Sequence, residues 1–462
     1  MEKRIVLIGA GSAQFGFGTI GDILKSKILE GSHIVLHDIN PVSLKKVHDV
    51  VQAYVDDNEL PFTFSATTSR PEALQGADFC ISSIEIGDRF ALWEQDWQIP
   101  LQYGIRQVYG ENGGPGGLFH SLRIVPPILE ICGDIMQICP QAHVFNFSNP
   151  MSRICTTVHR KYPDLQFVGL CHEIASLPRH LPRMLQTPFE NLSMVAGGLN
   201  HFSVLLECTY KDSGKDAYPD IRAKAGDYFS KVPTWPQVSA LFEKLQREWE
   251  QEGEQAVRDW AAIEREAETI EVAYEWAERG LFKVILENFG LLPITTDSHF
   301  GEYIQWAHDV VDHRGILDFY YHYKKSTLAK KPRMGKEATG EAVIPIIEAI
   351  LTDSGHEEMA VNLPNAGLID NLPEWLVVEV PATVDKDGVH GVPLGKLPSG
   401  FAGLLYNQVA IHDMTAEAVL SGSREVVLQA LLVDPIVHSK RAAEQTLETI
   451  LERQADYLGY IQ

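Results

Sequence analysis

The sequence has no long hydrophobic run and a deficit of basic residues. No stretch reaches the roughly 18 apolar residues of a membrane-spanning helix. The apolar run of residues 5–8 is too short for the core of a secretory signal peptide, so we interpret it as part of a first β-strand. These absences predict a cytoplasmic protein.

Cysteine is also scarce, with six in 462 residues, which excludes a disulfide-stapled scaffold and predicts reduced thiols. The chain carries 39 basic and 62 acidic side chains, a formal net charge of −23. This balance argues against binding to nucleic acid or to an anionic membrane surface. A small anionic substrate stays compatible, because it needs only a local cluster of cations.

Short apolar segments alternate with amphipathic helical segments through the first half of the chain. This alternation predicts an α/β fold built on a doubly wound parallel sheet. The second half carries charged helical segments at residues 219–289, two strands around an Asp387-Gly388 turn and helices after residue 413. We therefore predict a Rossmann-type domain at residues 1–195 and a mixed α+β domain at residues 196–462.

A glycine turn, GAGSAQF, follows the first predicted strand. Gly9 permits a tight turn, and Gly11 lets a pyrophosphate approach the backbone at a helix N-terminus. Asp38 ends the second strand and can accept a hydrogen bond from a ribose 2′-OH, which favours NAD over NADP. The fingerprint is incomplete, because Gln14 occupies its third glycine position. We predict that NAD binds Asp38 and the turn residues Gly9, Gly11, Ser12, Ala13, Gln14 and Phe15.

A cysteine and a histidine point to a metal. Cys171 ends a predicted strand, and His201 follows a glycine pair about thirty residues later. A thiolate and an imidazole together suit a divalent first-row metal. Two protein ligands would leave coordination positions open for substrate, as in catalytic sites. By themselves the two residues fit a buried cysteine and a hydrogen-bonded histidine better than a metal site.

Several motifs in order resemble glycoside hydrolase family 4, the NAD- and metal-dependent glycosidases. They cover nearly the whole chain: KRIVLIGAGSAQF, IPLQYGI followed by GENGGPGG, NFSNP, GLCHEI, GLNHF and VNLPNAGLIDNLPEWLVVEVPATVDKDGVH. The resemblance implies a Rossmann domain followed by a domain like that of lactate and malate dehydrogenases. It also implies assembly into homodimers or homotetramers.

The resemblance assigns Cys171 and His201 as ligands of Mn²⁺, or of another divalent first-row metal, and places Asn149 against substrate hydroxyls. It implies a redox route to hydrolysis, an exception to the usual pair of carboxylates. NAD⁺ oxidises C3 of the sugar, which acidifies the C2 proton. A base removes that proton, the C1–O bond breaks by elimination, water adds, and NADH returns the hydride. The metal stabilises the developing enolate charge.

The proton carriers are less clearly marked. Glu111 is the candidate acid, because many family members carry Asp at this place, although an exposed loop carboxylate would read the same. Asp297 is the candidate base, with His299 and Tyr303 as alternatives. Asp297 also fits the N-cap of a helix.

The residues after Cys171 indicate the substrate by resemblance. Cys-His-Glu followed by an aliphatic residue resembles α-galacturonidases, so we predict an α-galacturonide and place His172 and Glu173 in the sugar pocket. The alternatives within the family are an α-glucuronidase, an α-glucosidase and an α-galactosidase. Outside it they are an NAD-dependent 2-hydroxy-acid dehydrogenase and a catalytically silent NAD-binding module. Candidate cations for a uronate carboxylate are Arg89, His120, Arg123 and the basic run 324–336.

Overall fold

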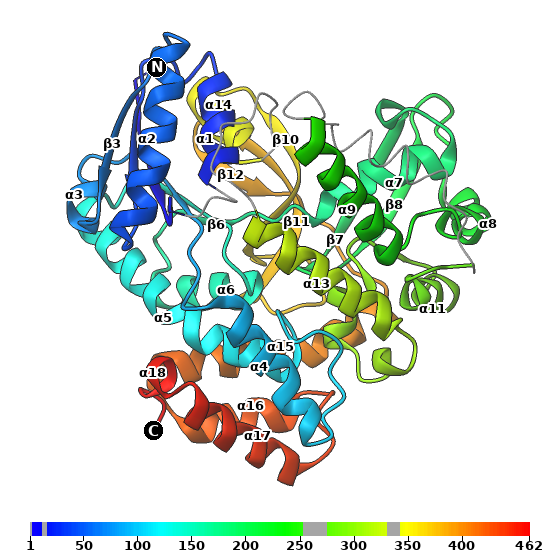
Figure 1. Cartoon of the computed structure of the whole chain (residues 1–462). Helices are drawn as coiled ribbons and strands as arrows, with labels where there is room; N and C mark the ends of the chain where they lie inside the picture. The colour runs from blue at the N-terminus through cyan, green and yellow to red at the C-terminus, as the bar shows by residue number, and fades with distance from the viewer. Residues whose placement is uncertain (1, 12–15, 253–274, 330–341) are drawn as a thin grey trace.

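The computed structural model describes residues 2–11, 16–252, 275–329 and 342–462 (Figure 1). Four predicted cofactor residues, Ser12, Ala13, Gln14 and Phe15, therefore lie outside the described residues, as does the end of the basic run from residue 330 onward.

A parallel sheet forms the first half of the fold. Its order is β3 (Thr63–Thr67), β2 (His33–His37), β1 (Arg4–Ile8), β4 (Phe79–Ser82), β5 (His143–Asn146) and β6 (Phe167–Gly169). All five neighbouring pairs are parallel. This is the strand order of dinucleotide-binding sheets, in which ligands bind where the order reverses, between β1 and β4. The predicted doubly wound α/β fold is confirmed.

Helices cover both faces of this parallel sheet. Alternate residues of a strand point to opposite faces, so each strand contributes side chains to both cores. Ile5 and Leu7 of β1 share a core with α1 (Gly16–Lys25) and α2 (Pro41–Asp57). Val6 and Ile8 share a core on the other face with α5 (Gly114–Ile138) and α6 (Met151–Lys161). The short α3 (Arg70–Leu74) and α4 (Arg89–Gln102) pack against α5.

The sheet continues past β6 as antiparallel strands. They run in the order β10 (His356–Pro364), β11 (Val377–Asp385), β7 (Leu192–Leu199), β8 (Phe202–Tyr210) and β9 (Leu292–Pro293). The predicted hairpin at Asp387-Gly388 joins β11 to β12 (Gly388–Gly391), and Gly388 has a φ of 122°. Because β10 pairs with β6, one sheet joins both halves of the chain. The boundary near residue 195 stays a prediction.

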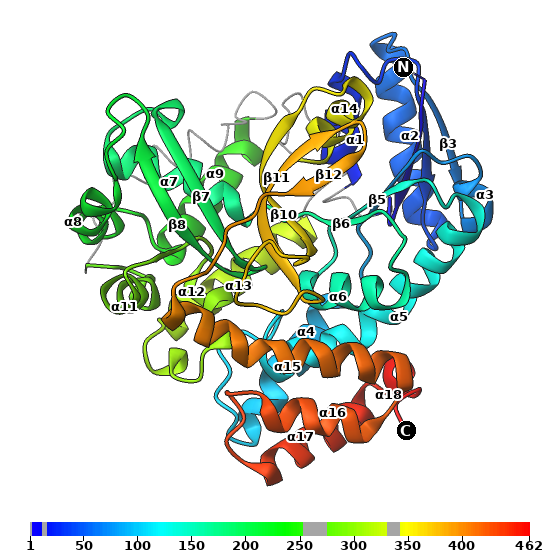
Figure 2. The same cartoon turned by 180° about the vertical axis from the view of Figure 1, so that it is seen from behind.

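The remaining helices surround this antiparallel part and close one end of the molecule. In Figure 2 the C-terminal helices lie together, and they contact α4 and α5. None of the described helices combines the length and apolarity needed to cross a membrane. Their bounds are α7 (Ser176–Leu185), α8 (Tyr218–Phe229), α9 (Trp235–Glu252), α11 (Gly280–Phe289), α12 (Asp297–Phe300), α13 (His313–Ala329), α14 (Val343–Thr352), α15 (Ser399–Ser421), α16 (Arg424–Val433), α17 (Lys440–Arg453) and α18 (Ala455–Leu458).

Candidate metal and cofactor sites

The glycine turn lies at the carboxyl end of β1. Gly9 has a φ of 86°, and a Cβ there would lie 2.2 Å from the carbonyl oxygen of Ser83. The Gly11 amide donates a hydrogen bond to Asp38 Oδ2 over 2.8 Å. The structure therefore brings Gly9, Gly11 and Asp38 together beside the point where the strand order reverses.

Three side chains meet where the parallel and antiparallel strands join. Cys171 follows β6, and His201 sits in the turn between β7 and β8 with a φ of 64°. Cys171 Sγ lies 3.5 Å from His201 Nε2, and Glu173 Oε1 lies 3.3 Å from the same nitrogen. The three candidate ligand atoms all lie within 4.8 Å of one another.

This geometry fits one metal ion. Metal–ligand bonds of about 2.0–2.3 Å place neighbouring ligand atoms roughly 3–4 Å apart, and both measured separations fall in that range. Glu173 Oε2 and His201 Nδ1 are buried and have no hydrogen-bond partner among the described residues. Asn149 Oδ1 is also buried without a partner in the described chain. The two free oxygens suit the hydroxyl groups of a ligand, whereas the candidate metal-binding nitrogen of His201 is Nε2 rather than the unpartnered Nδ1.

Glu173 was not expected among the metal ligands. Sequence reasoning placed it in the sugar pocket, whereas the structure places its carboxylate beside Cys171 and His201. The sequence offered no signal for this placement, because His172 has helical backbone angles and Glu173 begins a 3₁₀ turn, so the alternation of an extended strand does not apply. His172 lies between them, and its ring is 6.1 Å from that of Phe147.

Burial dominates the electrostatics of the three ligands. It raises the pKa of Cys171, with help from the charges of Glu173 and Glu379. It also raises the pKa of Glu173, where Glu379 contributes next. Burial and the charge of His299 lower the pKa of His201. A divalent cation favours the thiolate, the carboxylate and the neutral imidazole, so binding it would release protons.

Glu111 connects to this cluster through His299. His299 Nε2 lies 3.1 Å from Glu111 Oε2, and its Nδ1 lies 4.0 Å from Glu173 Oε1. Arg89 donates a hydrogen bond of 2.7 Å to Glu111 Oε1. Burial alone would raise the pKa of Glu111, but the bond to His299 and the charge of Arg89 hold this pKa well below its usual range. Glu111 as the acid stays a prediction, and its carboxylate is held ionised.

Asp297 is the first residue of the short helix α12. It is buried, and its two carboxylate oxygens accept hydrogen bonds of 2.9 and 3.2 Å from the amides of Leu281 and Phe282 in the first turn of α11. Burial raises its pKa to about 6. Its role as base stays a prediction. Of the alternatives left open, His299 contacts Glu111, whereas the Tyr303 hydroxyl faces the Asn200 carbonyl at 3.5 Å.

Each described candidate cation for a uronate faces a carboxylate. Arg89 lies between Glu85 and Glu111, and His120 Nε2 lies 3.4 Å from Glu85. These residues line a cavity with room for about one water molecule. Two further candidates have acidic partners of their own: Arg123 forms a two-pronged ion pair with Asp96, and Lys324 lies 2.6 Å from Glu94.

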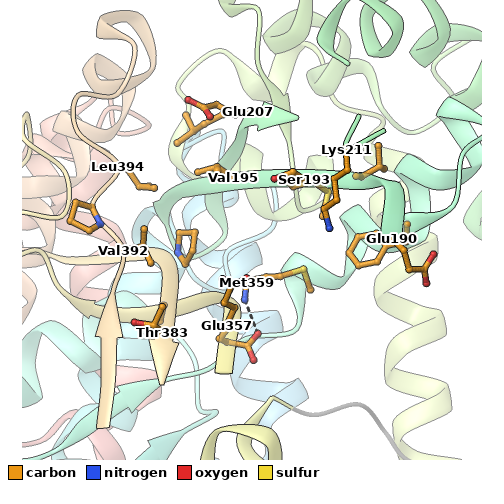
Figure 3. A pocket seen from close by; sticks show the side chains of 18 of the residues that line it. Glu190, Ser193, Val195, Glu207, Lys211, Glu357, Met359, Thr383, Val392 and Leu394 are labelled. Carbon is orange, nitrogen blue, oxygen red and sulfur yellow. Dashed lines mark hydrogen bonds between the residues drawn. The ribbon is translucent and has the colours of Figure 1, made fainter. Parts of the chain in front are cut away.

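A separate hollow of about 840 Å³ opens on the antiparallel strands (Figure 3). Glu190 and Lys211 lie toward one end in that view, and Val392 and Leu394 lie toward the other. The residues that line it do not include any of the predicted cofactor, metal or substrate residues.

Comparisons with known proteins agree along the chain. Residues 4–187 match the model described as Family 4 glycosyl hydrolase, and residues 196–437 match the model for its C-terminal domain. An α-glucosidase of Erwinia rhapontici is 57% identical over 462 residues, covering 100% of both chains. An α-galacturonidase of Thermoanaerobacterium saccharolyticum is 27% identical and covers 99% of this chain and 97% of its own.

One solved structure shares the fold over almost its full length. It is a 6-phospho-α-glucosidase from gut microorganisms in complex with NAD and Mn²⁺, with a TM-score of 0.75. The two chains are 20% identical, and the match covers 98% of each.

Proposed function

Because this chain belongs to family 4 of the glycosyl hydrolases, we propose that it hydrolyses neutral α-glucosides with a bound NAD and a bound divalent metal. The observation that carries this proposal is the cluster of Cys171, Glu173 and His201 at the end of a dinucleotide-binding sheet. The Erwinia α-glucosidase, identical at 57% of positions, supports the glucoside among the alternatives.

Cys171, Glu173 and His201 would hold the metal, with Mn²⁺ as the proposed ion. When bound, it polarises sugar oxygens and stabilises negative charge that develops beside them. The unpartnered Oδ1 of Asn149 would accept a hydrogen bond from a sugar hydroxyl group bound beside these residues. His172 stays a proposed pocket residue.

The glycine turn and Asp38 would hold NAD. A Cβ at Gly9 would collide with Ser83 O and one at Gly11 with Asp38 Oδ2, so both glycines keep the turn tight, and Asp38 is the proposed acceptor for a ribose hydroxyl. Ser12, Ala13, Gln14 and Phe15 stay predicted contacts. NAD supplies a hydride acceptor that is regenerated within one turnover, so the overall reaction is hydrolysis.

His299 is the proposed proton carrier. It lies between the carboxylates of Glu111 and Glu173, within 3.1 and 4.0 Å, and its Nδ1 also lies 2.9 Å from Thr296 Oγ1, so a ring nitrogen would exchange one of these contacts to pass a proton to or from a sugar. Arg89 and Glu111 would orient its ring. Asp297 has both oxygens engaged by backbone amides, which gives it less access to a substrate proton.

The α-galacturonide predicted from Cys171-His172-Glu173 is not the substrate we propose. A uronate needs a cation for its carboxylate, and the described candidates Arg89, Arg123 and Lys324 are each paired with an acid. The matching α-galacturonidase shares 27% of positions, against 57% for the α-glucosidase. A cytoplasmic location and a homodimer or homotetramer stay predictions.

Kinetics on nitrophenyl α-glucoside, α-galactoside, α-glucuronide and α-galacturonide would test the proposal. The assays need NAD⁺, Mn²⁺ and a reductant, each also left out in turn. We expect the α-glucoside to have the highest kcat/KM, both cofactors to be required and NADH not to accumulate. A preference for α-galacturonide would restore the uronide prediction. NADH released in proportion to product would instead identify a dehydrogenase.

A further inference from the structure

A fourth acidic side chain, Glu379, lies beside the metal cluster without being one of its ligands. It is the third residue of β11 and is 2% exposed. Asn200 Nδ2 donates to its Oε2 over 2.7 Å, and Ser203 Oγ donates to its Oε1 over 2.6 Å. Asn362 Nδ2 adds a longer bond of 3.4 Å to Oε2. Every one of these donors is neutral.

The donors come from the segments that carry the metal ligands. Asn200 and Ser203 flank the turn that presents His201, whose left-handed φ of 64° is uncommon for a residue other than glycine. Asn362 pairs with Gly169 at the end of β6, two residues before Cys171. The Glu379 carboxylate therefore links the segments of Cys171 and His201, and its two shortest bonds hold the turn.

The charge of Glu379 lacks a partner of opposite sign. No Lys, Arg or His of the described chain lies within ion-pair distance of it, unlike Glu111, which faces Arg89. A buried carboxylate without a cation is costly. Glu379 lies close enough to Cys171 and Glu173 for its charge to act on both. Burial raises the pKa of Glu379, as it does for Cys171 and Glu173, so these three acids gather in a place where a divalent cation would favour their ionised forms.

We propose that Glu379 is a positioning residue for the metal centre, which fixes the Asn200–His201 turn and supplies negative charge behind the ligands. It does not touch the metal, the sugar or NAD. The inference rests on the proposed metal site at Cys171, Glu173 and His201. Outer groups of this kind typically change metal affinity by about 10- to 100-fold.

The test is direct Mn²⁺ titration of the full-length protein, followed by electron paramagnetic resonance of the free ion, together with Tm measured without metal. Glu379→Gln keeps the shape and removes the charge. Glu379→Asp keeps the charge on a shorter side chain. It replaces Glu379→Gln in the titration if the Gln variant does not fold. Asp96→Asn is the matched control, because it removes a buried carboxylate that has a cation partner in Arg123.

We expect Glu379→Gln to weaken Mn²⁺ binding by roughly 10- to 100-fold while the metal-free Tm stays level or rises. Glu379→Asp should weaken binding less, and Asp96→Asn should lower Tm without changing Mn²⁺ affinity. The inference is overturned if Glu379→Gln binds Mn²⁺ within about threefold of wild type, or if its metal-free Tm falls as far as that of Asp96→Asn. If Cys171→Ser also binds Mn²⁺ normally, the proposed metal site itself fails.

Discussion

Asp96 and Glu379 are both almost fully buried, at 1% and 2% exposure, yet their surroundings differ. Asp96 lies where α4 meets α5 and the C-terminal helices, and it receives bonds from Arg123 and from Gln454 at 2.9 Å. Within the described part of the chain, Glu379 receives bonds only from neutral groups. A buried charge that is balanced within the fold serves stability, whereas one left unbalanced marks a place where a ligand completes the balance.

The largest expected effect on activity comes from removing a proposed metal ligand. Cys171→Ser should reduce kcat/KM on the preferred α-glycoside on the order of 10⁴-fold, about 5.5 kcal/mol of transition-state stabilisation. The protein should stay folded, because Cys171 is only partly buried at the margin of its core cluster and Ser is close to Cys in size. Steady-state kinetics with added Mn²⁺ and NAD⁺, beside circular dichroism, would measure this. Near-normal turnover would remove Cys171 from the metal site.

Changing Asp96 should instead lower the free energy of unfolding. Asp96→Asn leaves the Arg123 guanidinium buried without its counter-charge, which costs about 3–5 kcal/mol. Urea unfolding should show this loss, while Mn²⁺ affinity stays unchanged. If the variant were as stable as wild type, the ion pair would not hold α4 against α5. Arg123 would then again be a candidate for binding substrate.

The sequence predicts the parallel half of the fold well because its buried strands read as continuous apolar runs. Edge strand β3, Thr63–Thr67, has exposed and half-buried positions and carries no such run, so it was missed. The β7–β8 hairpin was not expected either, although GGLNHF contains its turn. Its pairing depends on contacts with β11 from much later in the chain.

The sequence predicted which residues form the site better than it predicted the role of each residue. Cys171 and His201 were paired through the family resemblance, and their atoms do lie 3.5 Å apart. Glu173 and Asp297 needed coordinates, because spacing does not say whether a carboxylate faces a thiolate or a helix terminus. Glu379 had a visible signal, a single charge inside the apolar run LVVEV. A prediction based only on the spacing of apolar residues ignores such a charge.

Asp434 has surroundings intermediate between those of Asp96 and Glu379. It is 3% exposed, accepts a bond of 3.0 Å from the Ile436 amide, and feels the charge of Arg153. The three guanidinium nitrogens of Arg153 have no hydrogen-bond partner among the described residues. Burial raises the pKa of Asp434 to about 6, although the Ile436 amide and Arg153 act in the opposite direction.

This raised pKa predicts how stability changes with pH. Between about pH 4 and pH 6 the folded state holds a proton that the unfolded state has lost, so the free energy of unfolding falls as pH rises. Over that window the advantage of wild type over Asp434→Asn should shrink by up to about 3 kcal/mol, since one pKa unit is about 1.4 kcal/mol. Urea titrations of both proteins at several pH values would measure it. A constant difference would mean that Asp434 is ionised throughout.

The smallest expected effect separates the two roles considered for Glu173. As a ligand beside Cys171 and His201, it supplies one of two negative charges to the cation, so Glu173→Gln should weaken Mn²⁺ binding by roughly 10- to 100-fold, about 1.4–2.8 kcal/mol. As a sugar-pocket residue, its loss would raise KM at saturating Mn²⁺ and leave metal affinity unchanged. Mn²⁺ titration and KM measured on the same preparation distinguish the two. His172→Gln is the control for metal affinity alone, since it leaves all three proposed ligands in place but changes a proposed pocket residue.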